Sequence, residues 1–462
     1  MKSEQNHISE LVDRFETMLK NDTPVFFEEE EFEDIADYYM RAGRFRRALD
    51  VAAMARNRHP FSPVFLVIQA QIHIHLNENR IALQLLQEAE RIEPFFGDIH
   101  MTRGTIYSQM GLSDKAIESF ETAGKHDIPM YEVNYYIACE LINQNRHTEA
   151  TSLLRRAVEE RPDFDSALNE LSLCYEVLDD REESIPVFQK CVDAHPYNST
   201  AWFCLGVSLS RAEKFTEALD AFDYALLIRA DFPPALFNKA NALAQLGRHQ
   251  EAIDTYKSVL DTDEPQANVY LHIGELYEHM NQPELALINY SKAIRLDSGL
   301  SDAWLGMGIV LDQQNRLSEG IHYIKKALEL EPENTMFLHT YGDFQRKLGF
   351  FEEAETAYRK VLELEPDDPG IWADYSQVQH EQQDFTGALE TLAEGIKYHP
   401  DDAELYYRFS ACLLANGFRQ EAFGNLQRGL ELDFSKHDIL FDFMPQLRNN
   451  PGLIDFIEAH RP

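Results

Sequence analysis

Residues 199–232 read STAWFCLGVSLSRAEKFTEALDAFDYALLIRADF, and residues 233–266 read PPALFNKANALAQLGRHQEAIDTYKSVLDTDEPQ. The two stretches have the same length of 34 residues, and Ala218 in the first occupies the same place as Ala252 in the second. Self-similarity at a fixed period of roughly 20–50 residues is typical of repeat proteins. The two stretches therefore indicate a repeat protein with a period of 34 residues.

The same pattern extends without insertion or deletion from residue 29 to residue 436, which gives twelve repeats of 34 residues. Position 20 of the repeat is small throughout: Ala48, Ala82, Ala116, Ala150, Ser184, Ala218, Ala252, Ala286, Gly320, Ala354, Ala388 and Ala422. Position 8 is also always Ala, Gly or Ser. Two helices can pack closely where neither presents a bulky side chain. Each repeat is therefore predicted to hold two antiparallel helices, at positions 1–14 and 17–30.

Other columns agree with this register. Position 32 is proline in seven repeats, and proline there would end the second helix because it has no amide donor. Glycine is frequent in the expected turn, where it suits a left-handed backbone. All three tryptophans of the chain fall at position 4: Trp202, Trp304 and Trp372.

This pattern resembles the tetratricopeptide repeat, and the chain resembles long bacterial cytosolic arrays of such repeats. The resemblance implies an all-α fold, a right-handed superhelical solenoid of twelve helix–turn–helix repeats at residues 29–436. Residues 1–28 are expected to form a capping helix and an extended linker, and residues 437–462 to form capping helices. The acidic run from Glu28 to Asp34 is read as the favourable start of the first repeat helix.

Composition limits the partners. The chain has 462 residues and a formal net charge of −37, which works against nucleic acid or an anionic membrane surface as a partner. No apolar stretch is long enough for a membrane span, and the first residues contain no signal-peptide segment, which predicts a cytoplasmic protein. The five cysteines have no metal-ligand spacing and are expected to be free thiols.

No catalytic or metal-binding motif emerges from the sequence. His73 and His75 are two residues apart, which places them on different faces of a helix. Gly306 and Gly308 lie in the middle of an expected helix and not in a phosphate-binding loop. The expectation is a protein that is not an enzyme and has no cofactor and no metal.

In the tetratricopeptide repeat family, positions 2, 5, 6, 9, 12 and 13 of the first helix line a concave groove that binds peptides. The resemblance therefore implies a candidate groove made of Phe203, Val207, Phe237, Asn238, Asn241, Leu271, His272, Glu275, Glu278, Asp302, Leu305, Asp312 and Asp343. The asparagines resemble those that hold a peptide backbone in this family. Four of these side chains are apolar and stand at position 5 of their repeats: Phe203, Phe237, Leu271 and Leu305. They either form an exposed floor of the groove or pack between successive first helices, and both interpretations remain open.

These observations predict a scaffold or adaptor that binds an extended or helical segment of a partner protein. The apolar stripe and the neighbouring acids favour a partner with apolar and basic residues. The family's clamp for a C-terminal carboxylate is not reproduced, because Phe237 stands where that clamp has lysine. The alternative is a structural protein that self-assembles through its terminal helices, for example as a homodimer.

Overall fold

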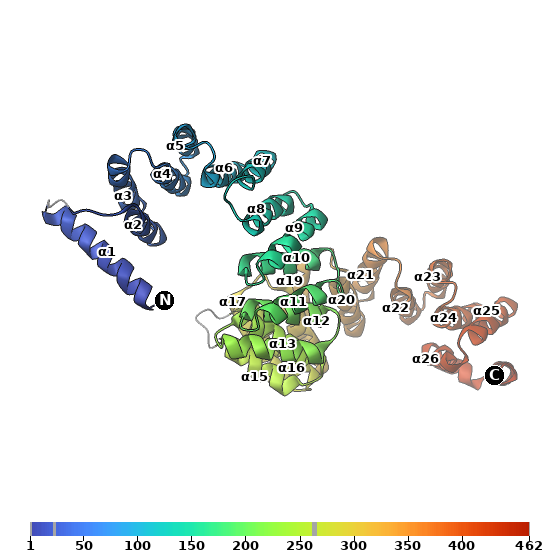
Figure 1. Ribbon diagram of the computed structural model, residues 1–462. Coiled ribbons are helices and arrows are strands. Elements are labelled where there is room, and N and C mark those ends of the chain that lie inside the picture. Colours follow the sequence, from blue (N-terminus) through green and yellow to red (C-terminus); the bar gives the residue numbers. More distant parts are fainter. Residues whose placement is uncertain (1, 22–24, 261–265, 462) are drawn as a thin grey trace. The chain divides into compact units, whose positions relative to one another are not determined.

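A computed structural model describes residues 2–21, 25–260 and 266–461 of the chain, with side chains from residue 7 onward. Within these ranges the chain forms 27 α-helices and two short 3-10 helices and contains no strand. It divides into two compact units, an N-terminal unit of residues 1–247 and a C-terminal unit of residues 248–462 (Figure 1). The all-α fold expected from the sequence is confirmed.

The N-terminal unit begins with a single long helix that is followed by helix pairs. Its helices are α1 (Lys2–Asn21), α2 (Glu29–Arg41), α3 (Phe45–Arg58), α4 (Val64–His75), α5 (Asn79–Ile92), α6 (Gly97–Gln109), α7 (Ser113–Ala123), α8 (Met130–Asn143), α9 (His147–Glu160), α10 (Asp165–Val177), α11 (Ser184–Ala194), α12 (Ser199–Arg211), α13 (Phe215–Ile228) and α14 (Pro233–Gln245).

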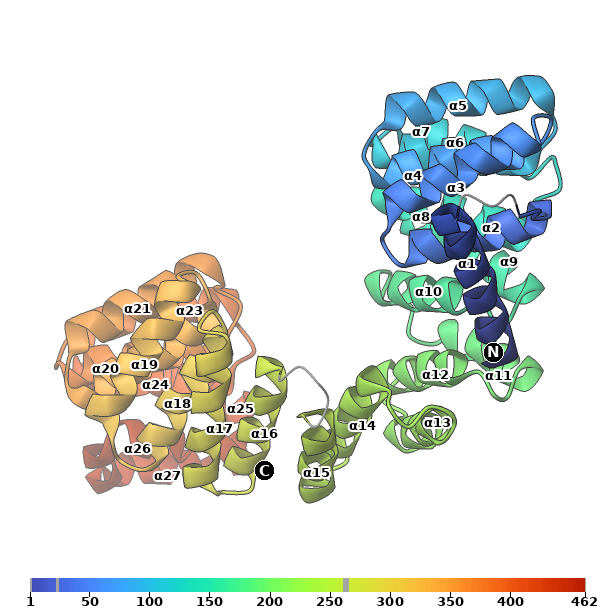
Figure 2. The same ribbon diagram turned by 90° about the vertical axis from the view of Figure 1, so that its left-hand side faces the viewer.

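The C-terminal unit continues the alternation of first and second helices, which pack against their neighbours in order along the chain (Figure 2). Its helices are α15 (His249–Leu260), α16 (Ala267–His279), α17 (Pro283–Leu296), α18 (Ser301–Gln313), α19 (Leu317–Leu330), α20 (Thr335–Leu348), α21 (Phe351–Leu364), α22 (Pro369–Glu381), α23 (Phe385–Tyr398), α24 (Ala403–Ala415), α25 (Arg419–Leu432), η1 (Phe434–Lys436), α26 (Ile439–Phe443), η2 (Pro445–Asn449) and α27 (Pro451–Ala459).

The small residues at positions 8 and 20 are placed where the two helices of a repeat meet. Ala218 is fully buried, and a Cβ on Gly206 would lie 2.5 Å from the ring of Phe222, so any larger side chain would displace that ring. The same relation holds at Gly274, where a Cβ would lie 2.7 Å from the ring of Tyr290. Phe222 and Tyr290 both occupy position 24 of their repeats. These contacts explain why a bulky residue at position 24 accompanies the small residues at positions 8 and 20.

The turn inside each repeat depends on one left-handed residue. All described residues with positive φ lie at position 15, with φ between 50° and 84°: Gly43, Asn77, Gly111, Asn145, Asp179, Glu213, Gly247, Asn281, Asn315, Gly349, Gln383 and Gly417. Only glycine adopts this conformation without a steric cost, and asparagine or aspartate adopts it more readily than other side chains. The period of the sequence is thus repeated in the backbone.

The three tryptophans at position 4 make equivalent hydrogen bonds. Each indole N–H donates to the backbone carbonyl six residues earlier, from Trp202 to Pro196 at 2.8 Å, from Trp304 to Ser298 at 3.0 Å and from Trp372 to Pro366 at 2.9 Å. Each acceptor belongs to the loop that joins one repeat to the next. The indole therefore ties that loop to the first helix of the following repeat.

The second helix of one repeat begins later than expected. Helix α11 begins at Ser184, three residues later than position 17, which is Arg181. The reason is Pro186, which lacks an amide donor and clashes with the carbonyl four residues before it, so it is tolerated only in the first turn of a helix. The helix cannot begin much before Glu183 and is shortened to 11 residues.

The end helices bury their apolar faces against the adjacent repeats. On α1, Leu11 and Phe15 are 2% and 0% exposed and pack in one cluster with Phe32 and Ile35 of α2. At the other end, the buried side chains of α26 and α27 join the cluster of α24 and α25. Pro24 of the predicted linker and Pro265 lie outside the described residues.

The acidic start of the first repeat has the expected role at a helix end. Glu28 caps α2, and its backbone N–H donates to the Glu31 carboxylate at 2.9 Å in a capping box. Arg14 of α1 also lies 3.3 Å from Glu31. Glu28 and Glu31 of this run thus hydrogen-bond at the start of α2, and Glu31 is also paired with α1.

Candidate functional site

Five of the candidate groove residues lie on two neighbouring first helices of the N-terminal unit. Phe203 and Val207 belong to α12, and Phe237, Asn238 and Asn241 belong to α14. All five side chains are half-buried, and the two helices are in contact. The structure therefore brings this part of the candidate groove together.

Phe203 and Asn238 have structural contacts in addition to their place on the candidate groove. The Phe203 ring lies 5.1 Å from the ring of Phe232 and packs beside Ala225, so part of it belongs to the core between repeats. The Asn238 amide Nδ2 donates to the carbonyl of Pro234 at 2.9 Å, within its own helix. The side-chain oxygen of Asn238 is its acceptor for any further hydrogen bond.

The two leucines at position 5 in the C-terminal unit are core residues. Leu271 of α16 and Leu305 of α18 are each only 6% exposed. Leu271 packs with Ala286 and Tyr290, and Leu305 with Ile324. At these positions the side chains are core residues that pack here against the second helix of their own repeat, and they offer almost no apolar surface to a ligand.

Two candidate acids are hydrogen-bonded to buried tyrosines. Tyr290 donates its hydroxyl to Glu278 at 2.8 Å, and Tyr358 donates to Asp343 at 2.6 Å. Burial, together with the adjacent carboxylate, raises the pKa of each phenol. These carboxylates therefore link the first helix to the core as well as contributing negative charge to its surface.

The remaining candidates of the C-terminal unit form a polar, mainly acidic set. His272 Nδ1 lies 2.8 Å from Glu275, and Asp312 is paired with Lys347 of α20. The pKa of Asp302 is raised, first by loss of water around its carboxylate and then by the charges of Glu331 and Glu275. Crowded carboxylates of this kind are stabilised by a cationic ligand.

An exposed apolar pair lies on α10, which contacts α12. Leu173 and Val177 are 54% and 62% exposed, and their i, i+4 spacing places them on one face of the helix. They occupy positions 9 and 13, which are groove positions by the family resemblance. Beside them, Arg211 of α12 donates to the carbonyl of Glu176 at 3.1 Å and is paired with Asp179 at the same distance.

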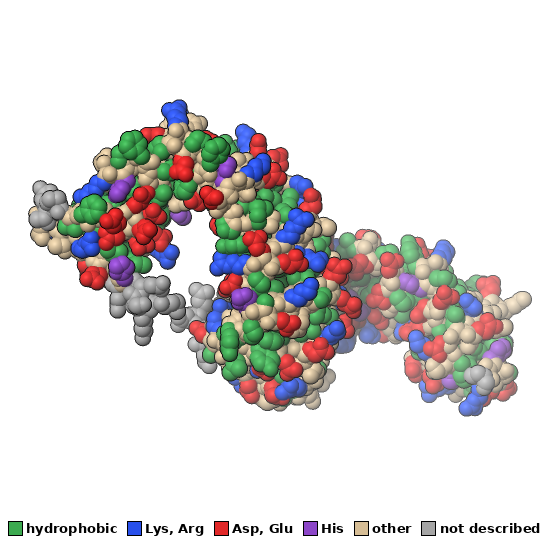
Figure 3. Space-filling model, viewed as in Figure 1, with side chains coloured by type: hydrophobic (Ala, Val, Ile, Leu, Met, Phe, Trp, Pro, Cys, Tyr) green, Lys and Arg blue, Asp and Glu red, His purple; other side chains and the backbone are tan. Residues whose placement is uncertain are grey.

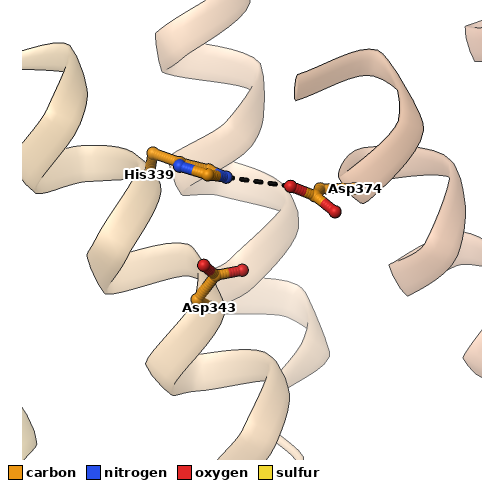
Figure 4. Close-up of side chains that lie close together, drawn as sticks. All are labelled: His339, Asp343 and Asp374. Carbon is orange, nitrogen blue, oxygen red and sulfur yellow. Dashed lines mark hydrogen bonds and ion pairs between the residues drawn. The ribbon is translucent and has the colours of Figure 1, made fainter. Parts of the chain in front are cut away.

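A group of three potential metal ligands lies between α20 and α22 (Figure 4). His339 Nε2 is 2.9 Å from Asp374 Oδ2, and Asp343 lies one turn along α20 from His339. One ligand atom from each of the three side chains lies within 4.8 Å of the others, and all three residues are half-buried. The hydrogen bond to Asp374 raises the pKa of His339, an effect that burial opposes.

The charged surface is mixed. Asp and Glu side chains are spread over the face seen in Figure 3, with Lys and Arg between them. Many of the ion pairs among the described residues join two exposed side chains, such as Arg316 with Glu319 at 2.7 Å. The acidity of the chain is thus mostly a distributed surface property.

Family models described as tetratricopeptide repeat match along most of the chain. One matches residues 33–95, 135–199 and 203–268, a second matches 97–123, 267–299 and 301–334, and a third matches 345–413. The chain belongs to the tetratricopeptide repeat family. Solenoids of this family stack neighbouring repeats and present extended concave surfaces for binding.

Curated relatives share the tetratricopeptide region at low identity. Anaphase-promoting complex subunit 3 of Schizosaccharomyces pombe is 23% identical over 52% of this chain and 31% of its own length. Human Protein O-mannosyl-transferase TMTC3 is 25% identical over 57% of this chain and 31% of its own length. TPR repeat-containing protein YpiA of Bacillus subtilis is 22% identical over 50% of this chain and 54% of its own length. The chain thus spans about a third to a half of each of these relatives.

Two features of these tetratricopeptide repeats are absent from the sequence prediction, although their signals are present in the sequence. Leu173 and Val177 are apolar at two groove positions of one helix, and His339 and Asp343 have the i, i+4 spacing of a metal-ligand pair. Adding Asp374 to this pair requires knowing how the next repeat packs against the repeat that holds His339 and Asp343.

Among the described residues, no helix is both long enough and apolar enough to cross a membrane.

Proposed function

We propose that the chain is a non-enzymatic interaction scaffold that binds segments of partner proteins on the first-helix faces of its tetratricopeptide repeats. The observation that carries the proposal is the exposed pair Leu173 and Val177 on one face of α10, a helix that contacts α12. Exposed apolar side chains gathered on one face mark a binding surface more often than isolated ones do.

The N-terminal unit is proposed to take apolar side chains of the partner. Leu173 and Val177 supply the contact surface, Phe237 extends it on α14, and Asn238 and Asn241 are suited to hydrogen bonds with a peptide backbone. Asn238 would accept a backbone N–H through its oxygen, while its amide nitrogen donates to Pro234.

The C-terminal unit is proposed to take basic side chains. Its first-helix faces carry Glu275, Glu278 and Asp302, and the raised pKa of Asp302 reflects crowding of negative charge. A lysine or arginine brought to this face would relieve that crowding. We propose binding at each unit separately.

The experiment is selection from a library of random displayed peptides against the full-length chain. The expected peptides fall into two classes, one enriched in apolar residues and one enriched in lysine or arginine. Leu173→Ser with Val177→Ser should weaken the apolar class by about 1–3 kcal/mol, the size of one or two buried side chains. Glu275→Gln with Asp302→Asn should weaken the basic class and reduce its dependence on salt.

Matched controls lie on the second helices. Leu227→Ser removes a side chain that is 81% exposed on α13, and Glu329→Gln removes an exposed charge on α19. Both should leave peptide binding unchanged. Phe203 is left intact because its packing against Phe232 would confuse binding with stability. Equal weakening by the control variants, or a library that yields no enriched peptides, would overturn the proposal.

For residues 1–28 and 437–462 we propose a capping role, which covers the apolar ends of the array. The name of the human relative TMTC3 describes a transferase, but the similarity covers only 31% of that protein. The matching part of this chain is also matched by tetratricopeptide repeat models. A catalytic activity is therefore not part of the proposal for this chain.

A further inference from the structure

Three side chains on the first helices of the tenth and eleventh repeats converge outside any function proposed so far. His339 and Asp343 are four residues apart on α20, so they project from the same face of that helix. Asp374 of α22 faces them, as the close-up in Figure 4 shows, with His339 Nε2 2.9 Å from Asp374 Oδ2. Within the described part of the chain, no other group of three such ligands is this compact.

The distances are compatible with coordination of one ion. Metal–ligand distances of about 2.0–2.2 Å place neighbouring ligands of a tetrahedral zinc site roughly 3.3 Å apart. The ligand atoms here already lie within 4.8 Å of one another, and one pair is closer than the tetrahedral separation. Small rotations of side chains that are only half-buried would close the difference.

The donor set selects the class of metal. An imidazole nitrogen suits zinc and the other late first-row metals, whereas magnesium and calcium are held by oxygen ligands. One histidine and two carboxylates therefore favour a divalent transition-metal ion. Partial exposure leaves the remaining coordination position to water or to a donor atom of a ligand.

The surroundings support a cation. Tyr358 donates its hydroxyl to Asp343 Oδ1 at 2.6 Å, which orients this carboxylate as outer partners commonly do at metal sites. Asp368 adds negative charge near His339. Arg346 is the opposing positive charge close to Asp343, but its Nη1 donates to Glu381 at 3.1 Å.

We propose that His339, Asp343 and Asp374 bind one Zn²⁺ ion, which joins the first helices of two consecutive repeats and leaves a coordination position facing solvent. This goes beyond the proposed peptide binding and does not depend on it. The bound ion would hold α20 and α22 at a fixed spacing. It would also place a positive charge on an otherwise acidic surface.

The experiment is calorimetric titration of Zn²⁺ into the untagged, full-length chain after treatment with a chelator, at neutral pH. The expected result is one tight equivalent above a background of weak binding to surface acids. Co²⁺ is the spectroscopic probe, because its visible absorption reports coordination by nitrogen and oxygen. His339→Gln and Asp374→Asn should each abolish the tight equivalent. Tyr358→Phe should weaken it about 10-fold, the lower end for loss of an outer hydrogen bond.

The control is His322→Gln, which removes an exposed histidine of α19 and should leave the tight equivalent unchanged. Circular dichroism of each variant checks that the helices form. Saturating Zn²⁺ should also raise the melting temperature of the parent chain but not of His339→Gln. The proposal is overturned if no tight equivalent is found, or if it persists in both His339→Gln and Asp374→Asn. Either result leaves the peptide proposal unaffected.

Discussion

At the scale of single residues, the left-handed position 15 explains a large part of the sequence pattern. Five repeats place glycine there, and Glu213 and Gln383 are the residues least suited to it. A side chain with a Cβ costs about 1–2 kcal/mol in this conformation. Those two turns are therefore less stable than the turns of the repeats that have glycine at position 15.

Glu213→Gly should stabilise the N-terminal unit. Relief of the left-handed strain is partly offset by about 0.4–1 kcal/mol of extra freedom in the unfolded chain, so the expected net gain is roughly 0.5–1 kcal/mol. Denaturant unfolding measures the gain. Glu213→Ala is the matched control, because it removes the same charge and keeps the Cβ. An equal gain in Glu213→Ala would show that the backbone conformation is not the cause.

At the scale of helices, a histidine lies at the contact between α22 and α26. The ring of His380 on α22 lies 4.6 Å from the Phe443 ring of α26 and 5.4 Å from the Phe385 ring. Its Nδ1 is buried without a hydrogen-bond partner among the described residues. Burial lowers the pKa of His380, with a smaller lowering by Arg408 and an opposing effect of Glu381.

Acidification should therefore loosen the C-terminal end. A histidine whose pKa is lower in the folded state contributes stability that is fully present above its unfolded pKa of about 6.5 and is lost as the pH falls. Hydrogen exchange in α26 and α27 should accelerate as the pH drops through this range, after correction for intrinsic exchange. The effect should be much smaller in His380→Phe and unchanged in His322→Phe, whose histidine is exposed. Identical pH profiles in all three chains would contradict this role of His380.

Helix positions were accessible to sequence reasoning because each repeat carries its own small and bulky columns. The depth of individual side chains was not. Phe203 stays half-buried while Leu271, at the same position two repeats later, is 6% exposed. That difference depends on the size of neighbouring side chains from other helices, such as Tyr290 beside Leu271. The late start of α11 could have been read from Pro186.

At the scale of the whole molecule, the end helices have two possible roles that predict opposite results. The apolar residues of α26 and α27 are largely used against α24 and α25, as with Leu440 and Leu453 at 0% exposure. Ile454 is an exception at 42% exposed. The buried contacts favour capping over self-association.

If the end helices are caps, removal of residues 437–462 uncovers Leu426 and Leu430 of α25. The shortened chains should then associate, which raises the particle mass measured in solution. Light scattering of the full-length chain should give a monomer mass that does not change with concentration, and Ile454→Asp should leave it unchanged. Under self-association through the end helices, the full-length chain would be a dimer or larger, and both the deletion and Ile454→Asp would lower its mass. The direction of the change thus separates the two roles.

The indole hydrogen bonds at Trp202, Trp304 and Trp372 give the molecule built-in optical probes. Each fluorophore is fastened to one junction between repeats, one in the N-terminal unit and two in the C-terminal unit. Loss of a junction would expose its indole to water and change its emission. Chains that keep one tryptophan and carry phenylalanine at the other two places would therefore show whether the array melts in a single event or junction by junction.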